Sequence, residues 1–390
     1  MNVELLNKIK SIDVIALKYL DDEQINELQN VKHSSFADFD SLYVFCFFKL
    51  MLAKKGVKET IERLGLIRPQ INELLYIEIA SYIYLSVGEY ELQLKSLELA
   101  RELTFGWVER AKVKSNIALG HIDVALEMTN KLVEISSANY DFAMSVYWQL
   151  NEWERLHSLS RKCDSQYLSE LSGYCIDIGN ECCDEKLKLY SLFNFYTINQ
   201  IELQKKLFSS SRMELIPSIG IQSDRLTTKS LELLGGKGQK GIVGASLSHL
   251  KIIEDIAHRD DYALVTESDA FLSRLCHDTK FLDNANGKYD FVLCANRHNV
   301  LNEECRDFDG IENFHFNGRA SGFDGYFITN GCAQEVMNAF DGKPHNEHID
   351  GKIIHWLATN GFRIGVTKHP IFSQGFCSTF STRARVELFN

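Results

Sequence analysis

Hydrophobic and polar positions change their spacing near residue 190. Before that point apolar residues recur mainly at helical spacing, and Pro69 is the only proline in the first 200 residues. Beyond it, short apolar runs of strand length alternate with helical patterns. The pattern therefore predicts an all-helical domain over residues 1–190 and an α/β domain with a largely parallel sheet over residues 191–390.

The helical region contains a degenerate repeat. Its turn residues, Gly88, Gly120 and Asn151, are separated by 32 and 31 positions, and a weaker fourth turn is expected at Gly179 and Asn180. The residues expected to pack the helices after the first three turns are Tyr90, Ile122 and Trp153. Over about residues 60–190 the period resembles tetratricopeptide-type hairpins, which stack because one hairpin cannot bury its apolar face alone. An irregular helical bundle is the alternative.

The second region is predicted to alternate strands with helices. Strands are expected at residues 193–198, 213–216, 262–266, 291–295, 326–329 and 362–367. Helices are expected at residues 202–210, 245–258, 332–340 and 351–359. Strands joined through helices favour parallel pairing, which collects the carboxyl ends of the strands at one edge of the sheet.

The most apolar stretch of the chain, residues 42–53, is too short to span a bilayer and contains Lys49. A buried core helix is the first interpretation of this stretch. The second is a peripheral contact with a membrane, in which Lys54, Lys55 and Lys58 face the lipid headgroups.

Charge and cysteine usage narrow the class of protein. The chain has 390 residues and a net charge of -11, which argues against nucleic acid as a partner because binding to its backbone needs a basic face. The ten cysteines form no CxxC pair, and the first residues lack the apolar centre of a signal peptide. These features predict reduced thiols and a cytoplasmic protein, with a peripheral position at the inner face of the membrane as a further expectation.

Two acidic residues follow the predicted strand at 262–266. They are Glu267 and Asp269, with Ser268 between them. Loops at the carboxyl ends of such strands are where α/β proteins place ligands. Alternate carboxylates can point the same way and supply hard oxygen ligands to Mg or Mn, which suit a diphosphate partner. Helix capping or a solvated loop explains the same residues without a function.

Four sequence blocks extend this picture. They read FYTINQIELQKKL, GIVGASLSHL, YALVTESDAFL, and GYFITNGCAQEVMNAF with HIDGKIIHWLATNG behind it. Together and in this order they resemble the family 25 glycosyltransferases, the bacterial lipopolysaccharide and lipooligosaccharide sugar transferases related to collagen galactosyltransferases. Two positions depart from the family pattern: Ala245 stands where the family usually has Cys, and Ser268 where it usually has Asp.

The resemblance implies a GT-A type (Rossmann-like) α/β domain, an inverting transfer and a UDP-sugar donor, most often UDP-galactose. Glu267 and Asp269 become the expected metal pair, with His369 late in the domain as a third ligand or, alternatively, as a structural histidine. Inversion also requires a base that takes the proton of the acceptor hydroxyl. Asp350 matches the family's Asp and is the first candidate, with a helix N-cap as its other role. Asp324 is the alternative base or a ligand of a sugar hydroxyl.

Donor-binding residues are expected in the first two blocks. Ile198 and Asn199 match positions that contact the nucleotide in the family. Lys205 and Lys206 replace its usual arginines near the phosphates, although a solvated helix face explains such a pair as well.

The second block supplies further candidates for the donor site. Gly241 and Gly244 suit a tight turn with close backbone approach. Ser248 and His249 are expected to line the donor pocket, to brace the acidic loop, or to be satisfied polar groups of the core.

The leading expectation is a metal-dependent transferase that moves galactose or another sugar from a UDP-sugar to a surface glycan, such as lipid-linked lipopolysaccharide core or O-antigen. The helical region would bind the acceptor, a membrane or a protein partner. One alternative keeps the chemistry and makes a protein the acceptor, gripped by the helical repeats. The other is an inactive glycosyltransferase-like binding module on a repeat scaffold.

Overall fold

A computed structural model describes residues 6–7, 9–10, 17, 41–100, 106–179, 187–193, 201, 204–205, 213–221, 226–229, 240–268, 270–272, 279–294, 305–316, 323–341, 348–369 and 371–374. The chain divides into two compact units, Met1–Met128 with Cys377–Asn390, and Thr129–Phe376. This division falls inside helix α7 (Ile122–Ile135), whereas the predicted boundary lies near residue 190. The change from helices to strands does fall between Gly179 and Leu187, so the last helices share a compact unit with the sheet.

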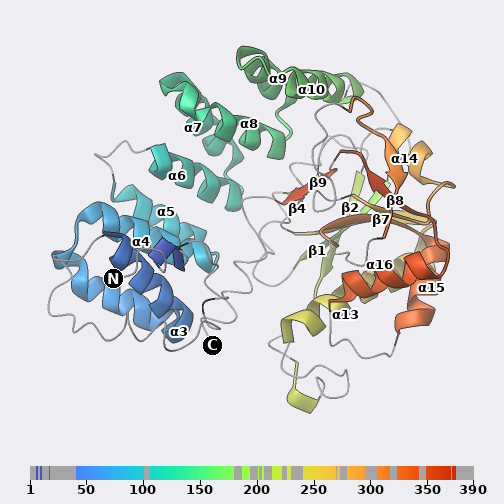
Figure 1. Ribbon diagram of the computed structural model, residues 1–390, viewed down its shortest axis with the longest axis horizontal. Coiled ribbons are helices and arrows are strands. Elements are labelled where there is room, and N and C mark those ends of the chain that lie inside the picture. The colour runs from blue at the N-terminus through green and yellow to red at the C-terminus, as the bar shows by residue number, and fades with distance from the viewer. Residues whose placement is uncertain are drawn as a thin grey trace. The chain divides into compact units, whose positions relative to one another are not determined.

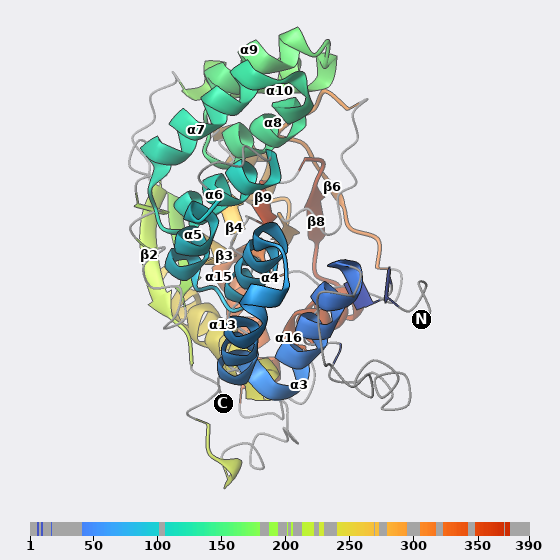
Figure 2. The same ribbon diagram turned by 90° about the vertical axis from the view of Figure 1, so that its left-hand side faces the viewer.

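The described residues from 41 to 179 are helical apart from short connections, as predicted (Figure 1). Within the first unit, the neighbouring helices α4, α5 and α6 pack side by side (Figure 2). The helices before the sheet are α3 (Ser41–Ile67), η2 (Arg68–Gln70), α4 (Glu73–Ser86), α5 (Tyr90–Glu98), α6 (Gly106–Ala118), α7, η3 (Ser137–Asn139), α8 (Tyr140–Gln149), α9 (Trp153–Lys162) and α10 (Gln166–Gly179).

The predicted repeat turns are confirmed. Gly88, Gly120 and Asn151 have φ values of 71°, 77° and 57°, in the left-handed region that ends helices. The residue after each turn donates its N–H to a carbonyl five positions earlier, over 2.9, 2.8 and 2.8 Å. A fourth turn of this kind lies at Asp164, between α9 and α10, where none was predicted. The expected turn at Gly179 coincides with the end of α10, and Asn180 lies outside the described residues.

The apolar stretch at residues 42–53 is a core helix, as first interpreted. Most of it is buried in α3, including Tyr43, Phe48 and Leu52. Lys49 is buried too, and its Nζ donates to the carbonyl of Lys10 at 2.7 Å. Among the described helices, none combines the length and apolar character needed to cross a bilayer.

The described strands of the second unit form a seven-stranded sheet in the order β2-β1-β3-β7-β5-β8-β6 (Figure 1). Strands β2, β1, β3, β5 and β8 share one direction, and β7 and β6 run opposite to them. A separate antiparallel pair consists of β4 (Ala270–Leu272) and β9 (Phe372–Gln374). The sheet strands are β1 (Leu187–Phe193), β2 (Met213–Ile219), β3 (Tyr262–Glu267), β5 (Phe291–Leu293), β6 (Ile311–Asn313), β7 (Gly325–Thr329) and β8 (Ile364–Thr367).

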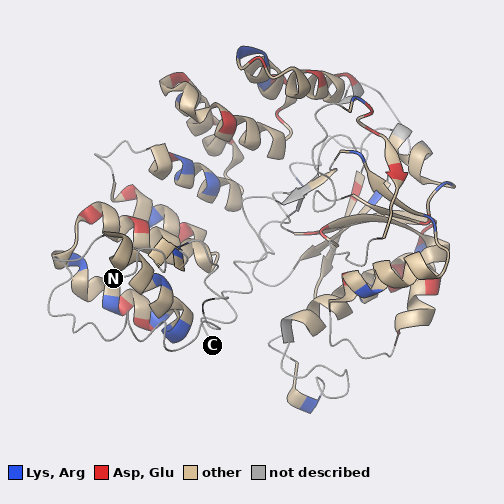
Figure 3. Ribbon diagram, in the orientation of Figure 1, with Lys and Arg blue, Asp and Glu red and all other residues tan. Residues whose placement is uncertain are grey.

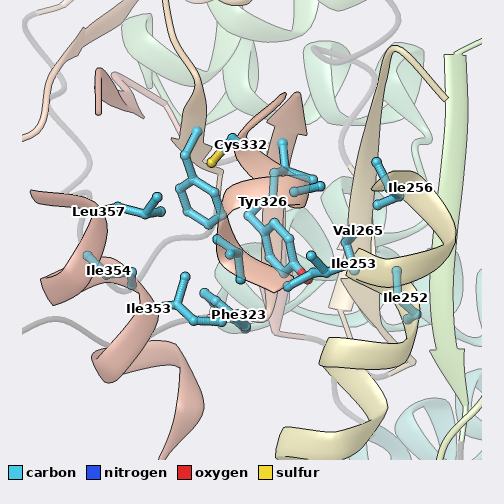
Figure 4. Close-up of a cluster of buried hydrophobic side chains, with 14 of the residues drawn as sticks. Ile252, Ile253, Ile256, Val265, Phe323, Tyr326, Cys332, Ile353, Ile354 and Leu357 are labelled. Carbon is cyan, nitrogen blue, oxygen red and sulfur yellow. The ribbon is translucent and has the colours of Figure 1, made fainter. Parts of the chain in front are cut away.

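Three helices pack with one face of this sheet around a common core. They are α13 (Lys240–Arg259), α15 (Asn330–Phe340) and α16 (Ile349–Thr359). Figure 4 shows Ile253, Val265, Tyr326 and Ile353 meeting in this core. Elsewhere in the sheet, Phe281 of α14 (Thr279–Ala285) packs edge-on against Phe327, with ring centroids 6.2 Å apart. The described architecture is thus a helical region followed by an α/β region.

Several predicted elements differ from those observed. The strand predicted at residues 193–198 is found earlier, as β1, and residues 194–200 lie outside the described part of the chain. Gly241 and Gly244 do not form the predicted tight turn, because α13 already begins at Lys240 and includes both. Most of the helix predicted at 202–210 is also outside the described residues. The strands predicted from residues 213, 262, 291, 326 and 362 are present with ends shifted by a few residues.

Candidate functional site

The strand order reverses at β1. Strand β2 pairs with one side of β1 and β3 with the other, both parallel to it. The chain therefore crosses from one side of β1 to the other between β2 and β3. Open α/β sheets bind ligands at such a switch point, in the crevice outside the carboxyl ends of the strands. Here those ends are Phe193, Ile219 and Glu267. The expected acidic loop therefore starts at the position in the sheet where a ligand site is most favoured.

Glu267 is held at the end of β3 by a histidine of α13. His249 Nε2 lies 3.3 Å from Glu267 Oε1, and His249 Nδ1 lies 3.4 Å from the hydroxyl of Tyr326. Burial and the nearby Glu267 carboxylate raise the pKa of Tyr326 well above its usual value, so the hydroxyl keeps its proton. Both contacts are satisfied when Nε2–H donates to Glu267 and Nδ1 accepts the hydrogen bond of the Tyr326 hydroxyl.

The Glu267 side chain is partly open to solvent, with 22% of it exposed, whereas that of His249 is 2% exposed. Within the described residues, no hydrogen bond is recorded to the second carboxylate oxygen, Oε2. One oxygen of Glu267 is thus oriented by His249, and the side chain remains partly exposed.

Asp324 lies directly beside Glu267. It precedes β7, which runs antiparallel to β3, so the start of β7 meets the end of β3. The backbone N–H of Glu267 and the hydroxyl of Thr266 both donate to the Asp324 carbonyl, at 3.2 and 3.0 Å. Asp324 is buried. The structure therefore brings together two residues that are 57 positions apart in the sequence and were both predicted to belong to the site.

Ser268, which replaces the family's usual Asp, is buried. Its N–H donates to the carbonyl of Leu192 at 2.9 Å. Its carbonyl accepts from Gln204 Nε2 at 3.3 Å, and Gln204 Oε1 in turn accepts from Ser191 at 2.6 Å. The middle position of the acidic motif is therefore part of the packing between β1 and β3. A small neutral side chain suits that burial, since an unpaired carboxylate would be costly there.

Ser248 acts as a brace at the end of β2. Its buried hydroxyl donates to the Gly244 carbonyl at 2.6 Å and accepts from the Ile221 N–H at 2.8 Å. These contacts occupy both functions of the hydroxyl. Among the roles expected for Ser248, these contacts match that of a satisfied polar group of the core.

Asp350 lies in the first turn of α16 and is half-buried. Its Oδ1 accepts from the N–H of Gly351 at 2.8 Å, while the N-cap position belongs to His348. Because α16 leads directly into β8, it starts at the edge of the sheet where β8 ends. Asp350 thus lies at the same edge of the sheet as Glu267.

His369 lies in a buried, largely aromatic environment. It is fully buried beyond the end of β8, and its Nδ1 lies 2.9 Å from the hydroxyl of Tyr167 on α10. Phe308 packs against it, with ring centroids 5.1 Å apart. Burial lowers the pKa of His369. The Tyr167 and Phe308 contacts hold the imidazole in place, and the expected role of His369 as a third metal ligand stays a prediction.

The remaining predicted residues are less informative. Lys205 is exposed in a short helical segment. Ile198, Asn199, Lys206 and Asp269 lie outside the described residues. Charges of both signs are interspersed over the described helices and strands (Figure 3). An anionic diphosphate at this edge would therefore depend on a local cation or on a few individual basic groups.

Of the carboxylates expected to hold a divalent cation, the structure describes Glu267. Among the described residues no group of three His, Cys, Asp or Glu side chains forms a metal site. Glu267 nevertheless supplies a hard, partly exposed oxygen, and Asp269 follows two positions later, outside the described residues. Carboxylate oxygens of this kind suit Mg or Mn.

Sequence reasoning missed three residues that shape this region. Tyr326 stands in an otherwise apolar strand, and a buried tyrosine usually needs a partner for its hydroxyl, which was an available signal. Gln204 and Tyr167 carried no such signal, because their partners come from distant parts of the chain.

Neither the known protein-family models nor the curated proteins include a match to this chain.

Proposed function

We propose that the α/β region is a metal-dependent, inverting glycosyltransferase of the GT-A type that uses a UDP-sugar, with UDP-galactose as the first donor to test. The observation that carries this proposal is the position of Glu267, a partly exposed carboxylate at the switch point of the sheet, backbone-bonded to Asp324. The resemblance of the four sequence blocks to family 25 supplies the reaction class.

Glu267 and Asp269 would hold the cation. A bound Mg or Mn would offset the negative charge that develops on the diphosphate as UDP leaves. His249 orients Glu267 by its contact with Oε1, and we propose that Oε2 binds the cation. Because Ser268 is buried, we assign it to the packing of the strand end and not to the cation.

Asp350 is our first candidate for the base. It is half-buried at the ligand-binding edge, where it can reach an acceptor hydroxyl and still be shielded from bulk water. Asp324 is more deeply buried, and its carbonyl joins β7 to β3. We assign it to the framework of the site and keep it as the alternative base.

The acceptor proposed first is a surface glycan, such as lipopolysaccharide core or O-antigen. A protein acceptor is a second candidate, favoured by one observation in the helices. A groove of about 410 Å³ lies over α7, α8 and α9, and its lining combines polar side chains such as Asn130, Glu154 and Arg155 with Val133 and Leu159. Such a surface offers hydrogen bonds to a peptide backbone.

The reaction is tested by incubating the full chain with individual UDP-sugars and Mn and measuring UDP release. Activity should require the metal and should be lost in Glu267→Ala and Asp269→Ala. Glu254→Ala, which removes an exposed carboxylate from α13, is the matched control and should keep full activity. Binding of UDP without turnover, unaffected by either acidic substitution, would instead indicate an inactive binding module.

The acceptor is tested in a strain that lacks the protein. A shortened lipopolysaccharide ladder supports the glycan acceptor. An unchanged ladder together with loss of a glycosylated protein supports the peptide acceptor. The two outcomes separate the acceptor classes without a change to the proposed donor chemistry.

A further inference from the structure

Helix α10 contacts the segment that joins β8 to β9 through a buried side-chain pair. The hydroxyl of Tyr167 and the Nδ1 atom of His369 are 2.9 Å apart, although the two residues are 202 positions apart in the sequence. Their rings are stacked, with centroids 5.8 Å apart and planes inclined by 25°. Both residues belong to the unit that contains the sheet.

A second layer of contacts surrounds this pair. The Phe308 ring packs against Tyr167 and Tyr174 of α10, at 6.3 and 5.5 Å between centroids. Arg306 lies over the Tyr167 ring at 5.9 Å and forms an ion pair with Glu170. An aromatic core with an ion pair at its rim resembles the packing of one folded domain, in contrast to the looser contact of a separate module.

The segment after His369 continues to the candidate site. The N–H groups of Ile371 and Phe372 both donate to the Cys294 carbonyl at 3.0 Å. Strand β9 then pairs with β4, with Phe372 opposite Leu272 and Gln374 opposite Ala270. Strand β4 begins three residues after Glu267, so β9 pairs with the strand that follows the acidic motif.

Phe372 also packs on Gly325, the residue that follows the hydrogen-bond partner of Glu267. It is fully buried over Gly325, where a Cβ would overlap the phenylalanine ring. Gly325 follows Asp324, whose carbonyl accepts from the N–H of Glu267. A continuous series of packed and hydrogen-bonded groups therefore leads from Tyr167 to Glu267.

We infer that Tyr167 and His369 are positioning residues: through them α10 holds β9 against β4, the strand that follows the acidic motif. Helix α10, the last helix before the sheet, is then part of the framework of the site. This positioning role concerns geometry alone, and only the Mn titration described below rests on the proposed function. It also implies that a fragment beginning near residue 190 lacks a required part of the α/β domain.

The test is hydrogen–deuterium exchange on the full chain, with Tyr167→Phe compared with Tyr147→Phe. Tyr147 is a matched control, because it is also a buried tyrosine, with its hydroxyl 2.7 Å from Asn130 Oδ1 and no link to β9. Removal of the Tyr167 hydroxyl should accelerate exchange in peptides covering β4 and β9 by roughly fivefold. The control should leave those peptides unchanged, and both variants should keep native circular dichroism.

His369→Gln provides a second variant, and it should accelerate the same peptides. Unchanged exchange in β4 and β9 for both Tyr167→Phe and His369→Gln would overturn the inference. A parallel titration with Mn alone separates it from the proposed function. Faster exchange in a chain that binds no Mn, even as wild type, would support the positioning role and count against the metal site.

Discussion

The Nε2 atom of His249 lies 3.3 Å from the Oε1 atom of Glu267, and this contact joins the middle of α13 to the carboxyl end of β3. The histidine is buried between the acidic residue and Tyr326, so its ring cannot turn away without losing both partners. A carboxylate held in this way presents its second oxygen in a fixed direction. Such preorganisation is what residues behind a metal ligand contribute to metal affinity.

Replacement of His249 by alanine should therefore weaken the site without unfolding the protein. We expect Mn affinity and UDP release to fall by about 10–100-fold, the usual effect of losing a group that orients a ligand. His258→Ala is the control, since that exposed histidine lies on the same helix and its Nδ1 is hydrogen-bonded to the Glu254 carbonyl. Equal activity of the two variants, measured as initial rates of UDP release, would contradict the role given to His249.

Asp350→Asn tests the assignment of the base. If Asp350 removes the acceptor proton, kcat should fall by roughly 10²–10⁴-fold while Mn affinity stays unchanged. Asp141→Asn, in the first turn of α8, makes the same change at another helix start and should have no effect on rate. A full rate in Asp350→Asn combined with a loss in Asp324→Asn would move the base to Asp324.

Because His369 is buried and its pKa is lowered, the stability of the folded protein should depend on pH. Burial lowers its pKa, and the Arg306 and Lys368 charges act in the same direction, while the Cys305 backbone and Asp307 act against them. The unfolded chain takes up a proton below about pH 6.5, and the folded chain does so only at lower pH. The histidine's contribution is thus fully present above pH 6.5 and is lost as the pH falls towards the folded pKa.

Thermal unfolding from pH 8 to pH 5 measures this effect. Between the two pKa values the wild type should lose up to about 1.4 kcal/mol per pH unit more than His369→Gln. Parallel curves for the two proteins would show that His369 does not change its proton affinity on folding.

The backbone conformations of Gly88, in a left-handed turn, and Gly65, in a helix, predict opposite effects when each is replaced by alanine. Gly88→Ala should destabilise the protein by about 1–2 kcal/mol, because its φ of 71° suits glycine and strains an alanine. Gly65→Ala should instead stabilise it by up to about 1 kcal/mol, since Gly65 is helical with open space around its Cβ position. Urea unfolding of the two variants compares them directly, and equal midpoints would contradict the turn geometry.

Local chemistry accounts for the parts of the fold that were predicted. The turns at Gly88, Gly120 and Asn151 were found from residue type and spacing, because few residues accept a left-handed conformation. Strand β3 was found because an apolar run of strand length is recognisable by itself. The two errors at α13 and β1 have the same origin, since element ends depend on tertiary packing as well as on local preference.

The sequence by itself determined the repeated helical turns, the alternation of strands and helices, and a pair of acidic residues at a strand end. Each of these depends on neighbouring residues, whose spacing carries the signal. The tertiary structure alone decided that His249 orients Glu267, that Asp324 lies beside it, and that His369 packs against Tyr167. These contacts join residues 18, 57 and 202 positions apart, and they depend on strand order and helix packing, which have no period in the sequence.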